Sequence, residues 1–434
     1  MSSPKILIVA TERWYPTVRL GMALANAGCA VSAVCPSPHP FSRTRALQKT
    51  YRYSGLSPLR AVRQAIVNSH PDFLIPGDDL ATHHLHELHQ QELTDNNSEN
   101  WISSLIERSL GSSESFPIVY ARAAFMKLAA EVGVRVPKTA VINNVNELRT
   151  WISSIGLPVV LKADGTSGGD GVRVVHTLKE AEHAFRKLQA PPLLARAVKH
   201  AVVDRDTTLL RSSLTRQKHM MNAQAFVRGC EATSAVFCWE GSVVASLHFE
   251  VLKKASLAGH ATVIRAIEHP EMSSAVENVA RCLNLSGLHG FDFMLEAETR
   301  NAYLIEMNPR STQVGHLQLG TNRDLPVAIC TTLSGRPVEA SARITEDDTI
   351  ALFPQEWLRD PQSSFINSAY QDIPRNEPEL VKDCIARIEA NGGTFSSRLT
   401  LDVYTEPGPA PRNLEDAWIA KPSKAAITKA SAHF

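Results

Sequence analysis

The stretch LPVVLKADGTSGGDGVRVV, from Leu157 to Val175, constrains the fold most, because a glycine-dense loop separates two runs of β-branched residues. Such runs favour β-strands, and clustered glycines allow a tight loop between them. Rossmann and Walker-type loops lead instead into a helix, and this stretch contains neither Gly-x-Gly-x-x-Gly nor Gly-Lys-Ser/Thr. The sequence therefore predicts a strand, a loop and a second strand.

The loop has the composition of a phosphate-binding loop. Glycines have no Cβ, so backbone N–H groups can turn toward an anion, and Thr166 and Ser167 add hydroxyl donors. Lys162, at the end of the first strand, supplies a positive charge for phosphate oxygens. A plain glycine-rich hairpin turn is the alternative. The loop glycines are Gly165, Gly168, Gly169 and Gly171.

A second cluster of polar residues lies downstream, in GFDFMLEAETRNAYLIEMNPRSTQVGH. Two apolar-rich runs, 291–295 and 302–307, flank the polar EAETRN and predict a β-hairpin. Glu306 and Asn308 are two positions apart on the second strand, so both side chains leave the same face, which Asp292 on the first strand can also reach.

Two carboxylates and an amide oxygen form a hard ligand set that suits Mg²⁺ or Mn²⁺, with nucleotide phosphates and water completing the octahedron. Arg310 follows two positions after Asn308, and its guanidinium suits a phosphoryl group in transfer. An exposed strand end with ordinary charges is the alternative. It fits Glu306 poorly, because an unpaired carboxylate between apolar neighbours is costly.

Together these two segments resemble the ATP-grasp superfamily, which includes biotin carboxylase, carbamoyl phosphate synthetase and the D-alanine ligases. The resemblance runs from about Pro117 to Pro337. It implies that Lys127, in AAFMKLAAEVGVRVPKTAV, is the first ATP lysine and that Lys162 is the second. It also places Arg310 on the phosphate side, as a catalytic residue together with Lys162.

The same resemblance assigns the remaining nucleotide and metal contacts. In QAFVRGCE it implies an adenine hinge, with backbone groups of Ala225 and Val227 facing the base, Gln224 beside them and Glu231 on the ribose hydroxyls. The metal ligands would be Asp292, Glu306 and Asn308. One departure is visible, since many relatives carry Glu or Gln where this chain has the shorter Asp292, and a shorter arm would weaken one of two metal sites.

The first hundred residues repeat a strand–helix pattern, which predicts a doubly wound α/β half. KILIVA precedes a helix near 18–27 that ends at Gly28, and AVSAVC and DFLIPGDD follow as strands. In the family such a domain lends side chains to the acceptor pocket. Asp78 and Asp79, at the carboxyl end of a strand, either lie at a ligand site or cap the next helix.

The overall fold class expected is α/β, with an α+β ATP-grasp domain behind a Rossmann-like domain. Thr94 to Phe116 is rich in Asn, Ser and Glu, is interrupted by WISSLIERSL, and is expected to be a surface connection. The expected division is a Rossmann-like domain at 1–116, an ATP-grasp domain at 117–337 with a glycine-loop subdomain at about 140–230, a small α-rich appendage at 338–404 and a disordered tail at 405–434.

Composition fits a multidomain cytoplasmic enzyme. The chain has 434 residues, 44% of them hydrophobic, and a net charge of +1, which gives no electrostatic reason to expect nucleic acid or a membrane as partner. Seven cysteines without Cys-x-x-Cys indicate small core residues in a reducing compartment. We expect small-molecule carboxylate and amine or thiol substrates as partners. The sequence leaves open whether the chain forms a homodimer.

Two further clusters are expected to be solvated surface. A basic stretch at 195–219 could meet a second anionic substrate, although such stretches are usually a solvated face. Metal binding is conceivable for the histidines after DFLIPGDD, yet a solvated helix face is the favoured interpretation. The histidines are His83, His84, His86 and His89.

The resemblance implies an ATP- and Mg-dependent ligase that activates a carboxylate as an acylphosphate and joins it to an amine or thiol. A small-molecule kinase or carboxyphosphate-forming enzyme, and a nucleotide-binding sensor without turnover, are the alternatives. The acceptor side is expected just past the metal strand, at Ser311, Thr312, Gln313 and His316.

Overall fold

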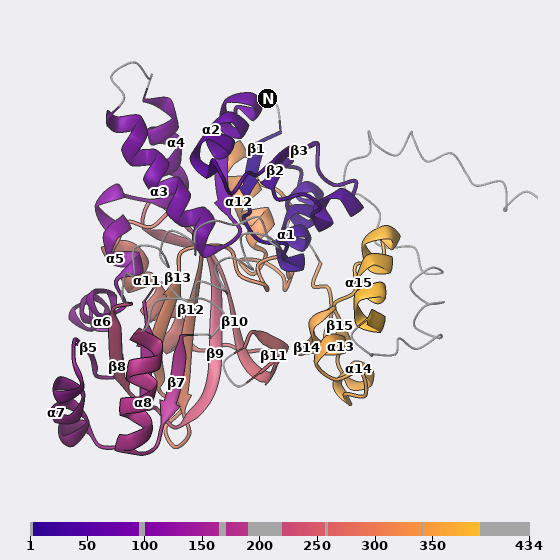
Figure 1. The fold of residues 1–434 in the computed structure, drawn as a ribbon. Helices are drawn as coiled ribbons and strands as arrows, with labels where there is room; N and C mark the ends of the chain where they lie inside the picture. The colour runs from indigo at the N-terminus through magenta and orange to yellow at the C-terminus, as the bar shows by residue number, and fades with distance from the viewer. Residues whose placement is uncertain are drawn as a thin grey trace, which may run out of the picture.

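The computed structural model describes residues 3–94, 100–164, 171–189, 219–256, 259–339 and 342–390. Three sheets make up this part of the chain: an N-terminal sheet of four strands, a small sheet of four and a large sheet of seven. The N-terminal sheet lies at one end of the large sheet, and the small sheet with α7 and α8 lies toward the other (Figure 1).

The N-terminal sheet has the order β3-β2-β1-β4, and all its strand pairs are parallel. Alternate residues of β1 enter two different cores, with Ile6 and Ile8 on one face and Leu7 and Val9 on the other. This confirms the doubly wound arrangement. The elements are β1 (Lys5–Val9), α1 (Tyr15–Asn26), β2 (Ala30–Cys35), η1 (Pro40–Arg43), β3 (Lys49–Arg52), α2 (Pro58–Ser69), β4 (Phe73–Pro76) and α3 (Asp79–Thr94).

The segment expected to be a surface connection contains a helix of this domain instead. α4 (Trp101–Leu110) buries Ile102, Leu105 and Ile106 in the same core as Leu7 and β4. These residues recur at helical spacing, so the helix has an apolar face to bury. The expectation of a surface connection was therefore wrong for 101–110.

The small sheet confirms the predicted strand–loop–strand unit. β6 (Val159–Ala163) and β7 (Val172–Val175) are antiparallel, with Lys162 opposite Val172. The loop between them, 165–170, lies outside the described residues. The sheet has the order β5-β8-β6-β7, completed by β5 (Thr139–Ile142) and β8 (Met221–Ala225), and its helices are α7 (Val145–Ile155) and α8 (Leu178–Gln189).

The large sheet contains the predicted acidic hairpin, β12 (Gly287–Glu296) and β13 (Ala302–Asn308). It is covered on both faces, since Phe237 and Val236 of β9 belong to different cores. Its order is β13-β12-β9-β10-β11-β14-β15. The other elements here are η2 (Ser113–Ser115), α5 (Phe116–Tyr120), α6 (Arg122–Glu131), β9 (Gly229–Trp239), β10 (Ser242–Lys254), β11 (Ala261–Ala266), α11 (Pro270–Cys282) and α12 (Leu325–Ser334).

The C-terminal segment packs into the main body of the molecule. β14 (Thr349–Ala351) pairs with β11, and β15 (Tyr370–Gln371) extends the same sheet. α15 (Pro378–Ala390) buries Leu380 and Ile388 in the core that also contains α1. The short helices between them are α13 (Gln355–Arg359) and α14 (Phe365–Ser368). In the described ranges, every helix is too short or too polar to traverse a lipid bilayer.

Candidate nucleotide and metal site

Lys162 lies where the small sheet meets the large sheet. Its side chain is only 4% exposed, and Nζ donates to the carbonyl of Ile305 on β13 at 3.0 Å. Burial lowers the pKa of this amine, as does the neighbouring charge of Arg122, while the carboxylate of Glu306 opposes the shift. A partly desolvated ammonium group beside the acidic strand can meet a phosphate without first losing a full hydration shell.

Asp292 and Glu306 are direct cross-strand partners on β12 and β13. Burial and the charge of Glu306 raise the pKa of Asp292 to about 6. Burial acts in the same direction on Glu306, but the attraction of Arg122 and Lys162 is larger and lowers its pKa. Two carboxylates held together at such a cost are suited to a divalent cation, which would remove the repulsion between them.

Asn308 joins this pair, as the two-residue spacing predicted. Its Nδ2 donates to Asp292 Oδ2 at 2.9 Å, and Thr233 Oγ1 donates to Asp292 Oδ1 at 2.9 Å. Asp292 is therefore oriented from both sides. The donor set contains only oxygen ligands, two carboxylates and one amide, which fits Mg²⁺ or Mn²⁺.

Arg122 is a site residue that the sequence analysis missed. From the start of α6 its Nη2 contacts Glu306 Oε1 at 2.6 Å, and its Nη1 lies 3.7 Å from Asp164 Oδ1. Lys127 does not reach this group, because its side chain is 79% exposed and pairs with Glu131 on its own helix. Five residues turn an α-helix by about 140°, so positions 122 and 127 face different directions. The helical period in the sequence indicates that the two side chains diverge, but it does not say which of them faces the site.

The expected adenine hinge follows β8, the strand between β5 and β6. Gln224 is buried and donates Nε2 to Thr139 Oγ1 at 3.1 Å, while the Ala225 N–H donates to the Lys138 carbonyl at 2.8 Å. Val227 lies in the turn beyond β8 and is partly exposed. The Ala225 amide is thus engaged within the protein.

Glu231 lies at the start of β9. Its Oε1 accepts from Lys254 Nζ at 2.5 Å, and its charge acts on Lys162. The structure therefore brings Glu231 close to the lysine that ends β6. A carboxylate at this edge, with a lysine neighbour, can accept hydrogen bonds from ribose hydroxyls.

Arg310, which follows β13, connects this strand to the N-terminal domain. Its Nε donates to Asp79 Oδ1 at 3.0 Å, and its guanidinium lies 5.7 Å from the centre of the Trp14 ring. Asp78 acts as the helix cap instead, because its carboxylate accepts from the backbone N–H groups of Thr11, at 2.6 Å, and Ala81, at 2.8 Å. Of the two aspartates, Asp79 is the one that faces the site.

The residues after Arg310 line the junction between the domains. Ser311 Oγ donates to the Pro76 carbonyl at 3.2 Å, and His316 Nε2 lies 2.8 Å from Asp372 Oδ2. Among the described residues, Thr312 Oγ1 and Gln313 Oε1 are buried without a hydrogen-bond partner. His316 is engaged with Asp372 through Nε2, and its Nδ1 is also buried without a hydrogen-bond partner in the described part of the chain.

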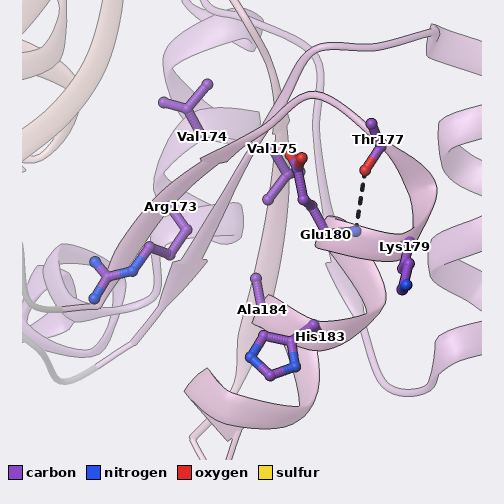
Figure 2. Close-up of a pocket in the computed structure, with 8 residues that line it drawn as sticks. All are labelled: Arg173, Val174, Val175, Thr177, Lys179, Glu180, His183 and Ala184. Atoms are coloured by element: carbon purple, nitrogen blue, oxygen red, sulfur yellow. Dashed lines mark hydrogen bonds between the residues drawn. The ribbon is translucent and has the colours of Figure 1, made fainter.

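Several expected residues fall outside the described ranges: Gly165, Thr166, Ser167, Gly168 and Gly169 of the loop, and the basic stretch apart from His219. His219 Nδ1 lies 3.0 Å from the Asp164 carbonyl oxygen. Figure 2 shows a separate hollow at β7 and α8, where Thr177 Oγ1 accepts from the Glu180 N–H at 3.2 Å. Its lining residues run from Arg173 to Ala184 and do not include the acidic hairpin or Lys162.

Comparison with known proteins identifies the class. The sequence profile of the carbamoyl-phosphate synthase L chain ATP-binding domain matches residues 121–318. The carbamoyl phosphate synthase large chain, N-terminal section, of Aquifex aeolicus is 23% identical over 319 residues, covering 71% of this chain and 52% of that protein. Acetyl-CoA carboxylase 1 of Oryza sativa is 25% identical over 220 residues, covering 49% of this chain and 9% of that protein.

Solved structures agree on the fold. The L-amino acid ligase from Bacillus licheniformis has a TM-score of 0.55 and 15% identity, with 80% of both chains covered. The biotin carboxylase domain of Hydrogenobacter thermophilus 2-oxoglutarate carboxylase also has a TM-score of 0.55, with 14% identity, covering 80% of this chain and 72% of that one. The chain has the ATP-grasp fold, and its residues 121–318 are similar in sequence to the carbamoyl-phosphate synthase ATP-binding domain.

Proposed function

We propose that the protein is an ATP- and Mg²⁺-dependent ligase that activates a carboxylate as an acylphosphate and joins it to an amine or thiol, with release of ADP and phosphate. One observation carries the proposal: Arg122 pairs with Glu306, Lys162 donates to the carbonyl of the preceding residue Ile305, and the strand partner of Glu306 is Asp292. The chain spans about half, or less, of the length of the first curated relatives that it matches. The substrates of this chain are therefore part of the proposal.

The geometry suits phosphoryl transfer. Such a reaction needs positioned charges more than a covalent catalyst. Lys162 and Arg122 would hold phosphate oxygens of ATP, and Arg310 would face the phosphoryl group as charge develops on it. The side chains of Asp292, Glu306 and Asn308 would hold Mg²⁺, and the ion would neutralise negative charge on the phosphates of ATP.

A carboxylate is a poor electrophile, so an amine or thiol attacks it only after one oxygen has become a leaving group. Transfer of the terminal phosphoryl group from ATP to the carboxylate gives an acylphosphate and ADP. The nucleophile then bonds to the acyl carbon, loses its proton, and expels phosphate. This sequence fits a site with phosphate-binding cations on one side and unsatisfied polar atoms on the other.

We place the acceptor substrates between the metal strand and the N-terminal sheet. Arg310, held by Asp79, lies at that junction, and the free polar atoms of Thr312 and Gln313 follow directly. The carboxyl ends of β1 and β4 meet there, which is where open parallel sheets bind ligands. The Bacillus licheniformis relative in fold is an L-amino acid ligase, which supports a carboxylate and an amine as substrates.

We also propose a reducing, cytoplasmic setting. All seven cysteines are free thiols, and five of them are buried, which is typical of proteins that carry no disulfides. The small-molecule site needs neither nucleic acid nor a membrane. The 2-oxoglutarate carboxylase domain of similar fold was solved as a dimer, which supports testing this chain for a homodimer by light scattering.

The function is tested by screening small carboxylates and amino acids, singly and in pairs, for release of ADP and phosphate with Mg²⁺. The proposal predicts turnover that needs both members of a pair, together with a product of the summed mass less water. ADP release with a carboxylate alone, and a stable phosphorylated product, would favour the small-molecule kinase. Nucleotide binding without turnover across a broad screen would favour the sensor.

A further inference from the structure

Three side chains on α3, none of them part of the acidic hairpin, lie close enough to share one ion. His83 Nδ1 and His84 Nδ1 are each 3.6 Å from Glu87 Oε2, and one ligand atom from each residue lies within 4.8 Å of the others. Helical spacing explains the grouping, because Glu87 follows His83 by four residues and His84 by three.

The distances fit coordination better than hydrogen bonding. A hydrogen bond between a ring nitrogen and a carboxylate spans about 2.7–3.2 Å, so 3.6 Å is too long in both cases. Two ligand atoms bound tetrahedrally to one ion at about 2.0–2.1 Å lie about 3.4 Å apart. The separations around Glu87 therefore resemble the edges of a metal site.

The buried state of His84 is an independent observation that points to a ligand. The residue is 5% exposed, and its Nδ1, which faces Glu87, has no hydrogen-bond partner among the described residues. Its Nε2 lies 3.1 Å from the Tyr53 hydroxyl, which fixes the ring orientation. An imidazole held through one nitrogen while the other is unsatisfied is the usual form of a metal ligand.

We propose that His83, His84 and Glu87 bind one divalent transition-metal ion of the Zn²⁺, Co²⁺ or Ni²⁺ type. Two imidazoles and one carboxylate are the ligands such ions prefer, and three protein ligands leave a position for water. The side chains of His83 and Glu87, 56% and 42% exposed, leave a path for the ion.

This site differs in chemistry from the one on the acidic hairpin. Asp292, Glu306 and Asn308 offer only oxygen, which suits Mg²⁺, whereas the α3 site offers two nitrogens. The α3 site is close in structure, because α3 begins at Asp79, the partner of Arg310, and His83 lies one turn further. A bound ion would stiffen the part of α3 that orients Arg310.

The expectation of a solvated histidine face is wrong for part of this helix. His84 and His89 are buried, and His89 Nε2 lies 3.2 Å from Glu107 Oε1. His86 stacks on Phe116 with 3.7 Å between ring centres. Of these four histidines, only His83 has a largely exposed side chain. This face of α3 is therefore mostly packed against the protein.

The test uses the untagged full chain, stripped with chelator and dialysed into excess Mg²⁺. Co²⁺ is titrated and followed by its visible absorption, and bound Zn²⁺ is counted by elemental analysis. The variants are His83→Ala, at an exposed position, and Glu87→Gln, at a half-buried one, and the matched control is His183→Ala on α8. Circular dichroism confirms that each variant is folded.

The proposal predicts one ion per chain in the presence of Mg²⁺, visible Co²⁺ bands of a nitrogen and oxygen site, and affinity weakened by about tenfold or more in both variants. The His183→Ala control should bind as the wild type does. Absence of stoichiometric binding would overturn the proposal. So would affinity in both His83→Ala and Glu87→Gln that matches the control.

Discussion

Arg122 and Glu306, 184 positions apart in the chain, form an ion pair with Nη2 and Oε1 separated by 2.6 Å. The same guanidinium donates Nη1 to the Ala163 carbonyl at 2.6 Å. One side chain thus connects α6, the end of β6 and the metal strand β13. The guanidinium of Arg122 therefore holds β6 and the acidic hairpin together.

Arg122→Ala should weaken ATP binding about tenfold to a hundredfold, because a charge-assisted contact is worth about 1.5–3 kcal/mol. Lys127→Ala is the matched control and should change affinity less than about twofold, since its exposed pair with Glu131 contributes little. Titration of a fluorescent ATP analogue measures both. The reverse order of effects would restore Lys127 to the site.

Asp79→Ala should lower kcat and leave the KM for ATP unchanged, because Asp79 acts by orienting Arg310 and does not itself touch nucleotide in this account. Steady-state ADP release with a productive substrate pair measures the split. Asp72→Ala, at an exposed carboxylate just before β4, is the control. A variant at Asp79 with full kcat would show that Arg310 needs no such partner.

Asp292→Asn should abolish Mg²⁺-dependent ATP binding without destabilising the metal-free protein at neutral pH. Asp292 has a folded pKa of about 6 against an ordinary value of 3.8, so its contribution to stability falls as pH rises between these values. Asn at position 292 does not ionise, so Asp292→Asn does not lose stability in this way as the pH rises. Its stability relative to the wild type should therefore increase from pH 4 to pH 7, as measured by urea unfolding in chelator. A stability of Asp292→Asn relative to the wild type that decreases from pH 4 to pH 7 would contradict this electrostatic explanation.

Asp372→Ala should lower the free energy of unfolding by about 3–5 kcal/mol, because it leaves Arg19 and His316 without their buried partner. Attraction from these two groups outweighs burial and lowers the pKa of Asp372, so the wild-type advantage exists above the ordinary carboxyl pKa and is lost as pH falls. Asp347→Ala, at an exposed carboxylate, is the control in urea unfolding. Equal losses in the two variants would contradict the prediction.

Local pattern was sufficient for the strands that carry the site. β-Branched runs on either side of the glycine loop predicted β6 and β7, and apolar-rich runs on either side of EAETRN predicted the β12–β13 hairpin. The two-residue spacing predicted that Asn308 and Glu306 share a face. These features depend on neighbours within a few residues, so the sequence alone contains their signal.

Contacts between distant segments were not predictable in this way. The choice of Arg122 over Lys127 depends on which face of α6 meets β13, and the pairing of Asp79 with Arg310 depends on how two domains pack. At α4 the helical spacing of Ile102, Leu105 and Ile106 was present in the sequence, but the polar residues on either side obscured it. Tertiary packing decides which of these distant residues meet, and local patterns in a single sequence do not show how segments pack.

Lys162, Arg122 and the acidic hairpin should together bind one Mg-nucleotide. Calorimetric titration of the wild type, Lys162→Ala and Glu306→Gln with a nonhydrolysable ATP analogue and Mg²⁺ examines this binding. We expect binding to the wild type, loss of binding in Lys162→Ala, and loss of the Mg²⁺ dependence in Glu306→Gln, with both variants folded. Wild-type affinity and Mg²⁺ dependence in both variants would contradict it.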